Sequence, residues 1–90
     1  MENGALEELT AAMAWYLERN TAKGEAFFAA FQATLQRINQ YPESSPLRGG
    51  YRRFPMPGFP FAVYTDEEGQ VVVAVAHAAR RPGYFRARRR

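Results

Sequence analysis

The sequence predicts an α+β fold in which a helical hairpin packs on a three-stranded antiparallel sheet. Apolar residues recur at three- and four-residue steps through residues 4–40, as they do along one face of a helix. After Gly49-Gly50 the pattern changes to short strand-like runs separated by turn residues. These turns are too short to contain crossover helices, so neighbouring strands are expected to be antiparallel.

Residues 4–40 are predicted to form two antiparallel helices joined by a very short connection. The first, over residues 4–20, carries an apolar stripe made of Leu6, Leu9, Met13, Tyr16 and Leu17. The second, over residues 22–40, has Phe27 beside a stripe made of Phe28, Phe31, Leu35 and Ile38. Asn20 is expected to end the first helix in a left-handed conformation, and Thr21 to cap the second.

Residues 41–46 contain two prolines and are expected to form an extended linker, and three strands are predicted after Gly49-Gly50. They span residues 51–56, 59–65 and 70–78, so residues 51–78 form an antiparallel meander. The helices and the sheet are expected to share one core that includes Leu9, Met13, Phe31, Leu35, Val73 and Val75.

The composition limits the possible classes of protein. Ninety residues fit a single domain, predicted as residues 1–90 with a helical hairpin (4–40), a meander (51–78) and a basic tail (79–90). With no cysteine and one histidine, the sequence predicts no disulfide, no metal site and no cofactor. Neither a signal peptide nor an apolar stretch of transmembrane length is visible, so a soluble, cytoplasmic protein without a membrane partner is expected.

Charge is unevenly divided between the two halves of the chain. Residues 1–45 hold three basic and six acidic side chains, a net charge of −3, whereas residues 46–90 hold nine arginines and three acidic side chains, a net charge of +6. Arginine binds carboxylate or phosphate groups through two parallel hydrogen bonds. The second half of the chain is therefore predicted to face an anionic partner.

A series of short motifs runs through the chain in a fixed order. They are Ala5-Leu-Glu-Glu-Leu9, Trp15-Tyr16, Tyr41-Pro42, Tyr51-Arg-Arg-Phe54, Gly58-Phe-Pro-Phe61, Val71-Val-Val-Ala-Val-Ala-His77 and Arg80-Arg-Pro-Gly-Tyr84. Together they resemble the ParE/RelE toxin superfamily, also called plasmid-stabilisation proteins, over residues 5–85. The most specific part is Ala76-His77 followed by Arg80-Arg-Pro-Gly-Tyr-Phe85.

The resemblance implies a bacterial toxin of a type II toxin–antitoxin system, held in a hetero-oligomer by a cognate acidic antitoxin. It is closer to ParE than to RelE, which implies inhibition of growth by binding of DNA gyrase. The superfamily fold is β-α-α-β-β-β, whereas only four residues precede Ala5 here, enough for a short extended stub. A partner strand or an open sheet edge is expected where the first strand would lie.

Three residues are candidates for catalysis if the chain is instead a RelE-like endoribonuclease that cleaves mRNA on the ribosome. Such cleavage needs a base, an acid and a cation near the phosphate. His77 can serve as acid or base, Arg81 supplies a cation and Tyr84 supplies a proton. Alternatively, His77 closes its strand through structural hydrogen bonds and Tyr84 packs on the sheet. Strand alternation places His77 on one face with Val71, Val73 and Val75.

Residues predicted to bind the target or the antitoxin are Arg52, Arg53, Arg80, Arg81, Tyr84 and Arg86. Arg52 and Arg53 are adjacent in a strand and therefore point to opposite faces, so one of them is expected to be exposed. Trp15 and Tyr16 offer an exposed aromatic contact, although helix spacing favours Tyr16 in the core. Two further alternatives stay open: a disarmed relative that only binds antitoxin, and a nonspecific nucleic-acid binder.

Overall fold

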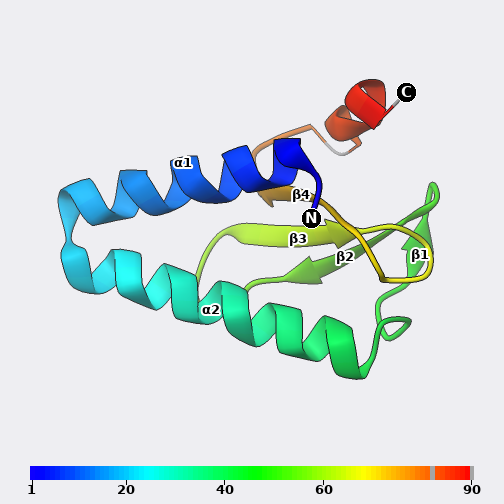
Figure 1. The fold of residues 1–90 in the computed structure, drawn as a ribbon, viewed down its shortest axis with the longest axis horizontal. Helices are drawn as coiled ribbons and strands as arrows, with labels where there is room; N and C mark the ends of the chain where they lie inside the picture. Colours follow the sequence, from blue (N-terminus) through cyan, green and yellow to red (C-terminus); the bar gives the residue numbers. More distant parts are fainter. Residues whose placement is uncertain (82, 90) are drawn as a thin grey trace.

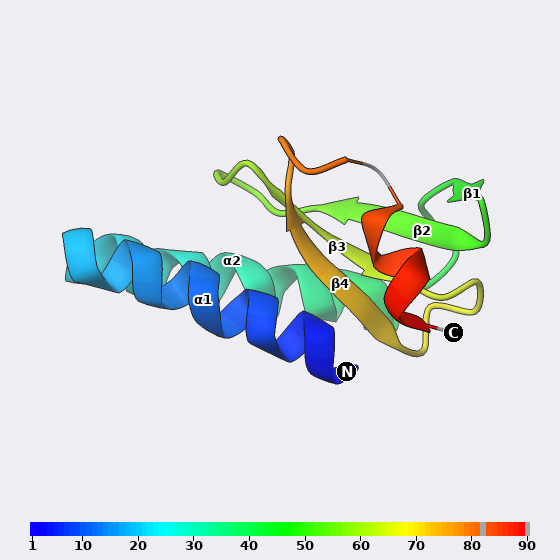
Figure 2. The same ribbon diagram turned by 90° about the horizontal axis from the view of Figure 1, so that it is seen from above.

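The computed structural model describes residues 1–81 and 83–89 and has the predicted α+β architecture. Its elements, in order, are α1 (Asn3–Arg19), α2 (Thr21–Gln40), β1 (Leu47–Arg48), β2 (Tyr51–Pro55), β3 (Phe61–Thr65), β4 (Val72–His77) and the 3-10 helix η1 (Tyr84–Arg89). The strands form one antiparallel sheet in the order β1-β2-β3-β4. The two helices run side by side along the sheet (Figure 1), and η1 lies on the opposite side of β4 from them (Figure 2).

The sheet has four strands among the described residues, one more than predicted. β1 lies between the predicted extended linker and the first predicted strand, and it pairs Leu47 with Arg52 and Arg48 with Tyr51. Gly49 and Gly50, with φ values of 58° and 85°, form the two-residue turn between β1 and β2. The sequence did not reveal β1 because two residues are too few to show a period.

The connection between the helices differs from the prediction. Asn20 has extended backbone (φ −165°) rather than a left-handed conformation, and its side chain accepts a hydrogen bond from the Lys23 amide at 3.1 Å. Its own amide donates to the Tyr16 carbonyl at 2.8 Å. Asn20 therefore ends α1 and caps α2 at the same time, and Thr21 is the first residue of α2.

The main core lies between the helices and the sheet and contains the predicted Leu9 and Phe31, with Met13 and Leu35 packed at its border. The buried faces of the helices are rotated relative to the predicted stripes, because Leu6 is 52% exposed and Phe28 is 39% exposed. Besides the predicted Phe31, small and aromatic residues fill those faces, notably Ala5, Ala12, Phe27 and Ala30. Alanines let the helices approach closely, a role that a search for large apolar residues overlooks.

A β-bulge divides the apolar residues of β4 between the two faces of the sheet. Thr65 lies opposite Val72 and Tyr64 opposite Ala74, so Val73 is an extra residue in β4. Val72 and Val75 join the main core, whereas Val73 is buried in a second cluster with Phe85 on the other face. The predictions that Val73 belongs to the main core and shares a face with Val75 and His77 are therefore wrong.

The N-terminal backbone lies beside β4, at the edge of the sheet. Glu2 is extended (φ −70°, ψ 154°), and its amide donates to the Val72 carbonyl at 3.0 Å. The chain then turns into α1 at Asn3. Glu2 before α1 is thus extended and bound to β4, the edge strand of the sheet.

Candidate functional site

Glu8 is the centre of a polar cluster that joins α1, β4 and η1. One carboxylate oxygen accepts hydrogen bonds from the Val75 amide at 3.0 Å and from the Arg88 guanidinium at 2.9 Å. The other oxygen accepts from the Tyr84 hydroxyl. The Glu8 side chain is only 17% exposed, so these bonds to Val75, Tyr84 and Arg88 are screened less than surface ion pairs. We call these four residues the Glu8 cluster.

His77, at the end of β4, is exposed and engaged in the turn that follows the strand. Its Nδ1 accepts a hydrogen bond from the Ala79 amide at 2.9 Å. The imidazole ring meets the Phe61 ring edge to face, with 5.1 Å between the ring centroids. Within residues 1–81 and 83–89, no hydrogen bond or ring contact joins His77 to Tyr84.

Tyr84 is surrounded by cations. The Arg80 guanidinium carbon lies 3.9 Å from the centroid of the Tyr84 ring, and that of Arg88 lies 5.4 Å from it. Arg81 is exposed. The structure thus brings together Tyr84 and Arg80 of the predicted site, while Pro82 of the Arg80–Tyr84 motif and Arg90 of the basic tail lie outside the described residues.

The adjacent arginines of β2 have different surroundings. Arg52 donates to the carbonyls of Ser45 at 2.6 Å and Glu67 at 2.8 Å, which ties the linker after α2 to the β3–β4 turn. Arg53 points to the other face of the sheet, is exposed and is the one of the two that lines a groove. Arg53, unlike Arg52, is thus available to a partner.

A wide groove of about 720 Å³ lies on the face of the sheet away from the helices. We call it the arginine groove, because Arg48, Arg53 and Arg86 line it and, among the described residues, no acidic side chain does. Its aromatic lining is held in place by ring contacts of Phe85 with Tyr51 and Tyr64, at centroid distances of 4.7 and 5.0 Å. Such a surface suits carboxylate or phosphate groups.

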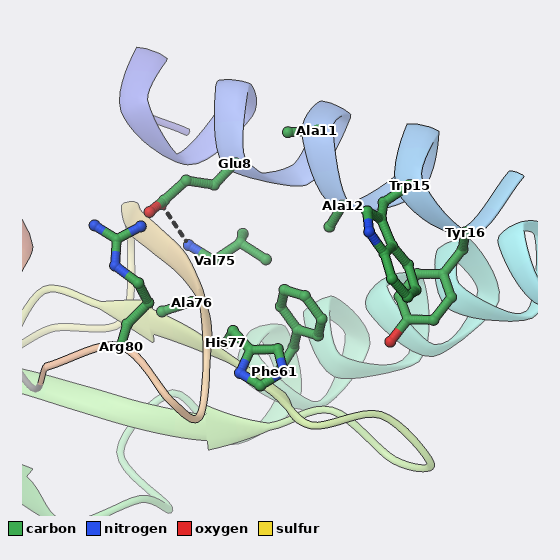
Figure 3. A pocket seen from close by; sticks show the side chains of 10 residues that line it. All are labelled: Glu8, Ala11, Ala12, Trp15, Tyr16, Phe61, Val75, Ala76, His77 and Arg80. Atoms are coloured by element: carbon green, nitrogen blue, oxygen red, sulfur yellow. Dashed lines mark hydrogen bonds between the residues drawn. The ribbon is translucent and has the colours of Figure 1, made fainter. Parts of the chain in front are cut away.

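A second, smaller groove of about 370 Å³ runs between α1 and β4. Figure 3 shows Ala12 and Trp15 on α1 opposite Val75 and His77 of β4, with Glu8 and Arg80 toward one end. Most of its lining is apolar: Ala11, Ala12, Trp15, Tyr16, Phe61 and Val75. We call it the edge groove.

Sequence reasoning missed Glu8, Phe85 and Arg48. Glu8 falls outside the predicted apolar stripe, yet it lies one turn before Ala12 on the buried face of α1. Phe85, 1% exposed, was assigned to the basic tail, although an aromatic residue within an arginine-rich segment is a signal of packing. Arg48 lies in no predicted element, because β1 was not predicted.

Metal and membrane features are not found in the described part of the chain. Residues 1–81 and 83–89 contain no group of three or more His, Cys, Asp or Glu side chains placed to hold a metal ion. None of their helices is both long and apolar enough to cross a membrane.

Comparison with known proteins agrees with the motifs found in the sequence. A family model described as the ParE toxin of the type II toxin–antitoxin system parDE matches residues 1–82. Comparisons with curated proteins and with solved structures gave no match. The family match includes both long helices and all strands β1 to β4. Because it covers most of the chain, the chain belongs to the ParE toxin family of type II toxin–antitoxin systems.

Proposed function

We propose that this chain is a single-domain cytoplasmic toxin that inhibits growth by binding DNA gyrase, without catalysing a reaction. The observation that carries this proposal is the engagement of the candidate acid–base residues. The Tyr84 hydroxyl donates to Glu8, and the Nδ1 of His77 accepts from a backbone amide. A general acid or base must reach the proton that it transfers, and the Tyr84 hydroxyl and the Nδ1 of His77 are engaged in structural bonds. The arginine groove, in contrast, is open.

A cognate antitoxin is the second partner of this proposal, and its acidic segment occupies the arginine groove. The groove holds Arg48, Arg53 and Arg86 without an acidic residue among the described ones. Opposite charges accelerate encounter and select orientation. Arg80, Arg81 and Tyr84 lie outside the lining of this groove and are left to the target or to a second part of the antitoxin. Arg52 is removed from the proposed contacts because loop carbonyls hold it.

One observation favours a RelE-like ribonuclease as a second candidate. The Arg80 guanidinium lies 3.9 Å above the Tyr84 ring, so a cation stands beside a possible proton donor. In that mechanism Tyr84 would have to leave Glu8 to protonate the leaving oxygen, and a base for the 2′-hydroxyl would still be required. We therefore place this candidate second.

The two candidates differ in what the purified protein does to DNA gyrase and to translating ribosomes. Binding of gyrase predicts inhibited supercoiling, with no new mRNA ends in a translation reaction. Tyr84→Phe keeps the ring and removes the proton donor. Gyrase inhibition is therefore expected to change less than about threefold, because the hydroxyl is bonded to Glu8 and the ring that can meet the target is kept.

Cuts in mRNA that appear with the wild-type chain and fall about 10²–10⁴-fold in Tyr84→Phe or His77→Ala would reverse the order of the candidates. A protein that is inactive in both assays yet binds the antitoxin encoded by the neighbouring reading frame would be a disarmed relative. Nonspecific nucleic-acid binding would appear as equal affinity for unrelated DNA and RNA duplexes, with a steep loss of affinity in salt.

A further inference from the structure

The outer edge of β4 is only partly hydrogen-bonded. The Ala78 amide donates to the Pro60 carbonyl at 2.8 Å, and alternation along the β3–β4 ladder then turns the polar groups of Ala76 toward β3 and those of Val75 and His77 away from it. The Val75 amide binds Glu8, and the His77 carbonyl accepts from the Arg80 amide. The Val75 carbonyl and the His77 amide face outward, and neither has a hydrogen-bond partner in residues 1–81 and 83–89.

These two groups flank Ala76, and their positions determine whether an added strand can be parallel or antiparallel to β4. A residue of a parallel strand opposite Ala76 would donate to the Val75 carbonyl and accept from the His77 amide. An antiparallel strand would need the Val75 amide as well, and Glu8 already holds it. Earlier along the same edge, extended backbone is already bound, since the Glu2 amide donates to the Val72 carbonyl.

The edge groove supplies room for the side chain of such a residue. Ala11 and Ala12 keep this part of α1 thin, and Trp15, 52% exposed, forms one wall (Figure 3). A Trp wall beside an apolar hollow is typical of the anchor pockets that dominate binding energy in interfaces. Cations stand near both ends: Arg80 lines the groove, and Arg19 stacks on Trp15 with 3.8 Å between its guanidinium carbon and the ring centroid.

We propose that an extended segment of the cognate antitoxin joins the sheet as a parallel strand beside residues 75–77, with an apolar side chain in the edge groove and acidic residues near Arg80 and Arg19. This inference rests on the proposed function only in that the toxin pairs with an antitoxin. A second copy of this chain is a poorer occupant, because its net charge of +3 repels the same arginines. The site is distinct from the arginine groove, with which it shares no lining residue.

Trp15 is the single tryptophan of the chain and therefore reports on the groove directly. The chain is labelled with 5-fluorotryptophan and combined with the unlabelled antitoxin encoded by the neighbouring reading frame. The one fluorine resonance is expected to shift, and its chemical shift should no longer differ between H2O and D2O. Hydrogen exchange of the His77 amide is expected to slow by about tenfold or more, because the amide gains a hydrogen bond. A complex that forms with both signals unchanged overturns the proposal.

Matched variants of α1 test the groove itself. Ala11→Gln places a polar side chain in the edge groove, whereas Ala14→Gln makes the same change at an exposed position outside its lining. Neither changes the net charge, and both residues are exposed, so both variants are expected to fold. Ala11→Gln should weaken antitoxin binding by about tenfold or more, and Ala14→Gln by less than about threefold. Equal affinities for the two variants contradict the proposal.

Three outcomes identify the occupant of the edge and distinguish failure of the toxin–antitoxin pairing from failure of the proposed site. Concentration-dependent protection of the His77 amide in the isolated chain would assign the edge to a second copy and overturn the proposal. An antitoxin that binds neither the wild type nor the variants would reject the proposed pairing, and this inference with it. An antitoxin that binds all three chains equally leaves the pairing intact and rejects only the site.

Discussion

Arg52 and Arg53 are neighbours in β2 whose side chains serve different purposes. Successive residues of a strand face opposite sides, so one backbone segment delivers one arginine to each face. Arg52 reaches loop carbonyls at 2.6 and 2.8 Å, where each bond involves a charged donor. Arg53 lines the arginine groove. The same residue type therefore bonds to the fold at one position and is exposed in the arginine groove at the next.

Replacement of each arginine by glutamine is expected to separate these purposes. Arg52→Gln should lower the free energy of unfolding by about 1–2 kcal/mol, because hydrogen bonds to two carbonyls are lost. Arg53→Gln should change it by less than about 0.5 kcal/mol, since the side chain is exposed. Urea unfolding followed by circular dichroism measures both. Equal losses would mean that the bonds of Arg52 add no net stability.

For single residues, the sequence identifies candidate site residues more readily than it identifies the contacts that those residues make. The arginines and Tyr84 were recognised as candidates, and opposite faces were assigned to Arg52 and Arg53. The contact of Tyr84 with Glu8 spans 76 positions, and no local pattern carries information over that distance. The role of Arg52 depends on where two loops meet, which is a property of the tertiary structure.

The β3–β4 turn and the linker after α2 are two elements that hold each other in place. Asp66 accepts hydrogen bonds from the amides of Gln70 at 2.8 Å and Val71 at 3.2 Å, which shapes the turn. Gly69 has φ +72°, and a Cβ added there would lie 2.8 Å from the Pro42 carbonyl oxygen. The turn therefore requires glycine for its conformation and also for its close approach to the linker.

Two glycine substitutions distinguish these requirements. Gly58 has a similar φ of +78°, but a Cβ there would meet nothing within 4 Å among the described residues. Gly58→Ala is expected to cost about 1–2 kcal/mol from the left-handed conformation alone. Gly69→Ala should cost at least about 1 kcal/mol more, because Pro42 must also move. Thermal unfolding of the two variants gives the difference; identical midpoints would remove the Pro42 contact from the explanation.

The elements were predicted well where the periodic pattern of apolar residues continues over many positions, and poorly where that pattern is interrupted. Both helices and strands β2 to β4 were found because each repeats its pattern over several residues. The bulge adds Val73 to β4 and so reverses the alternation of side chains between the two faces of the sheet. The sequence pattern carries no sign of this, so the two faces of β4 were assigned incorrectly. η1 was assigned to the basic tail because its arginines conceal Phe85, the residue that attaches it to the sheet.

Across the whole molecule, charge and apolar surface are sorted to different places. The groove on the outer face of the sheet is lined by three arginines, whereas the groove at the edge of the sheet is mainly apolar. The excess of acidic residues lies in the half of the chain that forms the helices. A partner with an acidic segment is therefore attracted to one side of the toxin before any contact is made.

Association with the antitoxin, for which we propose an acidic segment, is accordingly expected to depend on ionic strength. The association rate should fall by about tenfold between low and physiological salt. Arg53→Gln should flatten this dependence more than Lys23→Gln, which removes the same charge from α2. Stopped-flow measurements over a salt series test this. Parallel slopes for the two variants would mean that net charge, and not the arginine groove, guides association.

The Glu8 cluster also has a consequence for the time at which this protein becomes complete. Glu8 meets Tyr84 and Arg88 across 76 and 80 positions of a 90-residue chain. A ribosome adds about 5–20 residues per second, so Tyr84 and Arg88 are synthesised several seconds after Glu8. The Glu8 cluster therefore forms only after η1 has been synthesised. Until then, a newly made chain lacks the hydrogen bonds that attach η1 to α1.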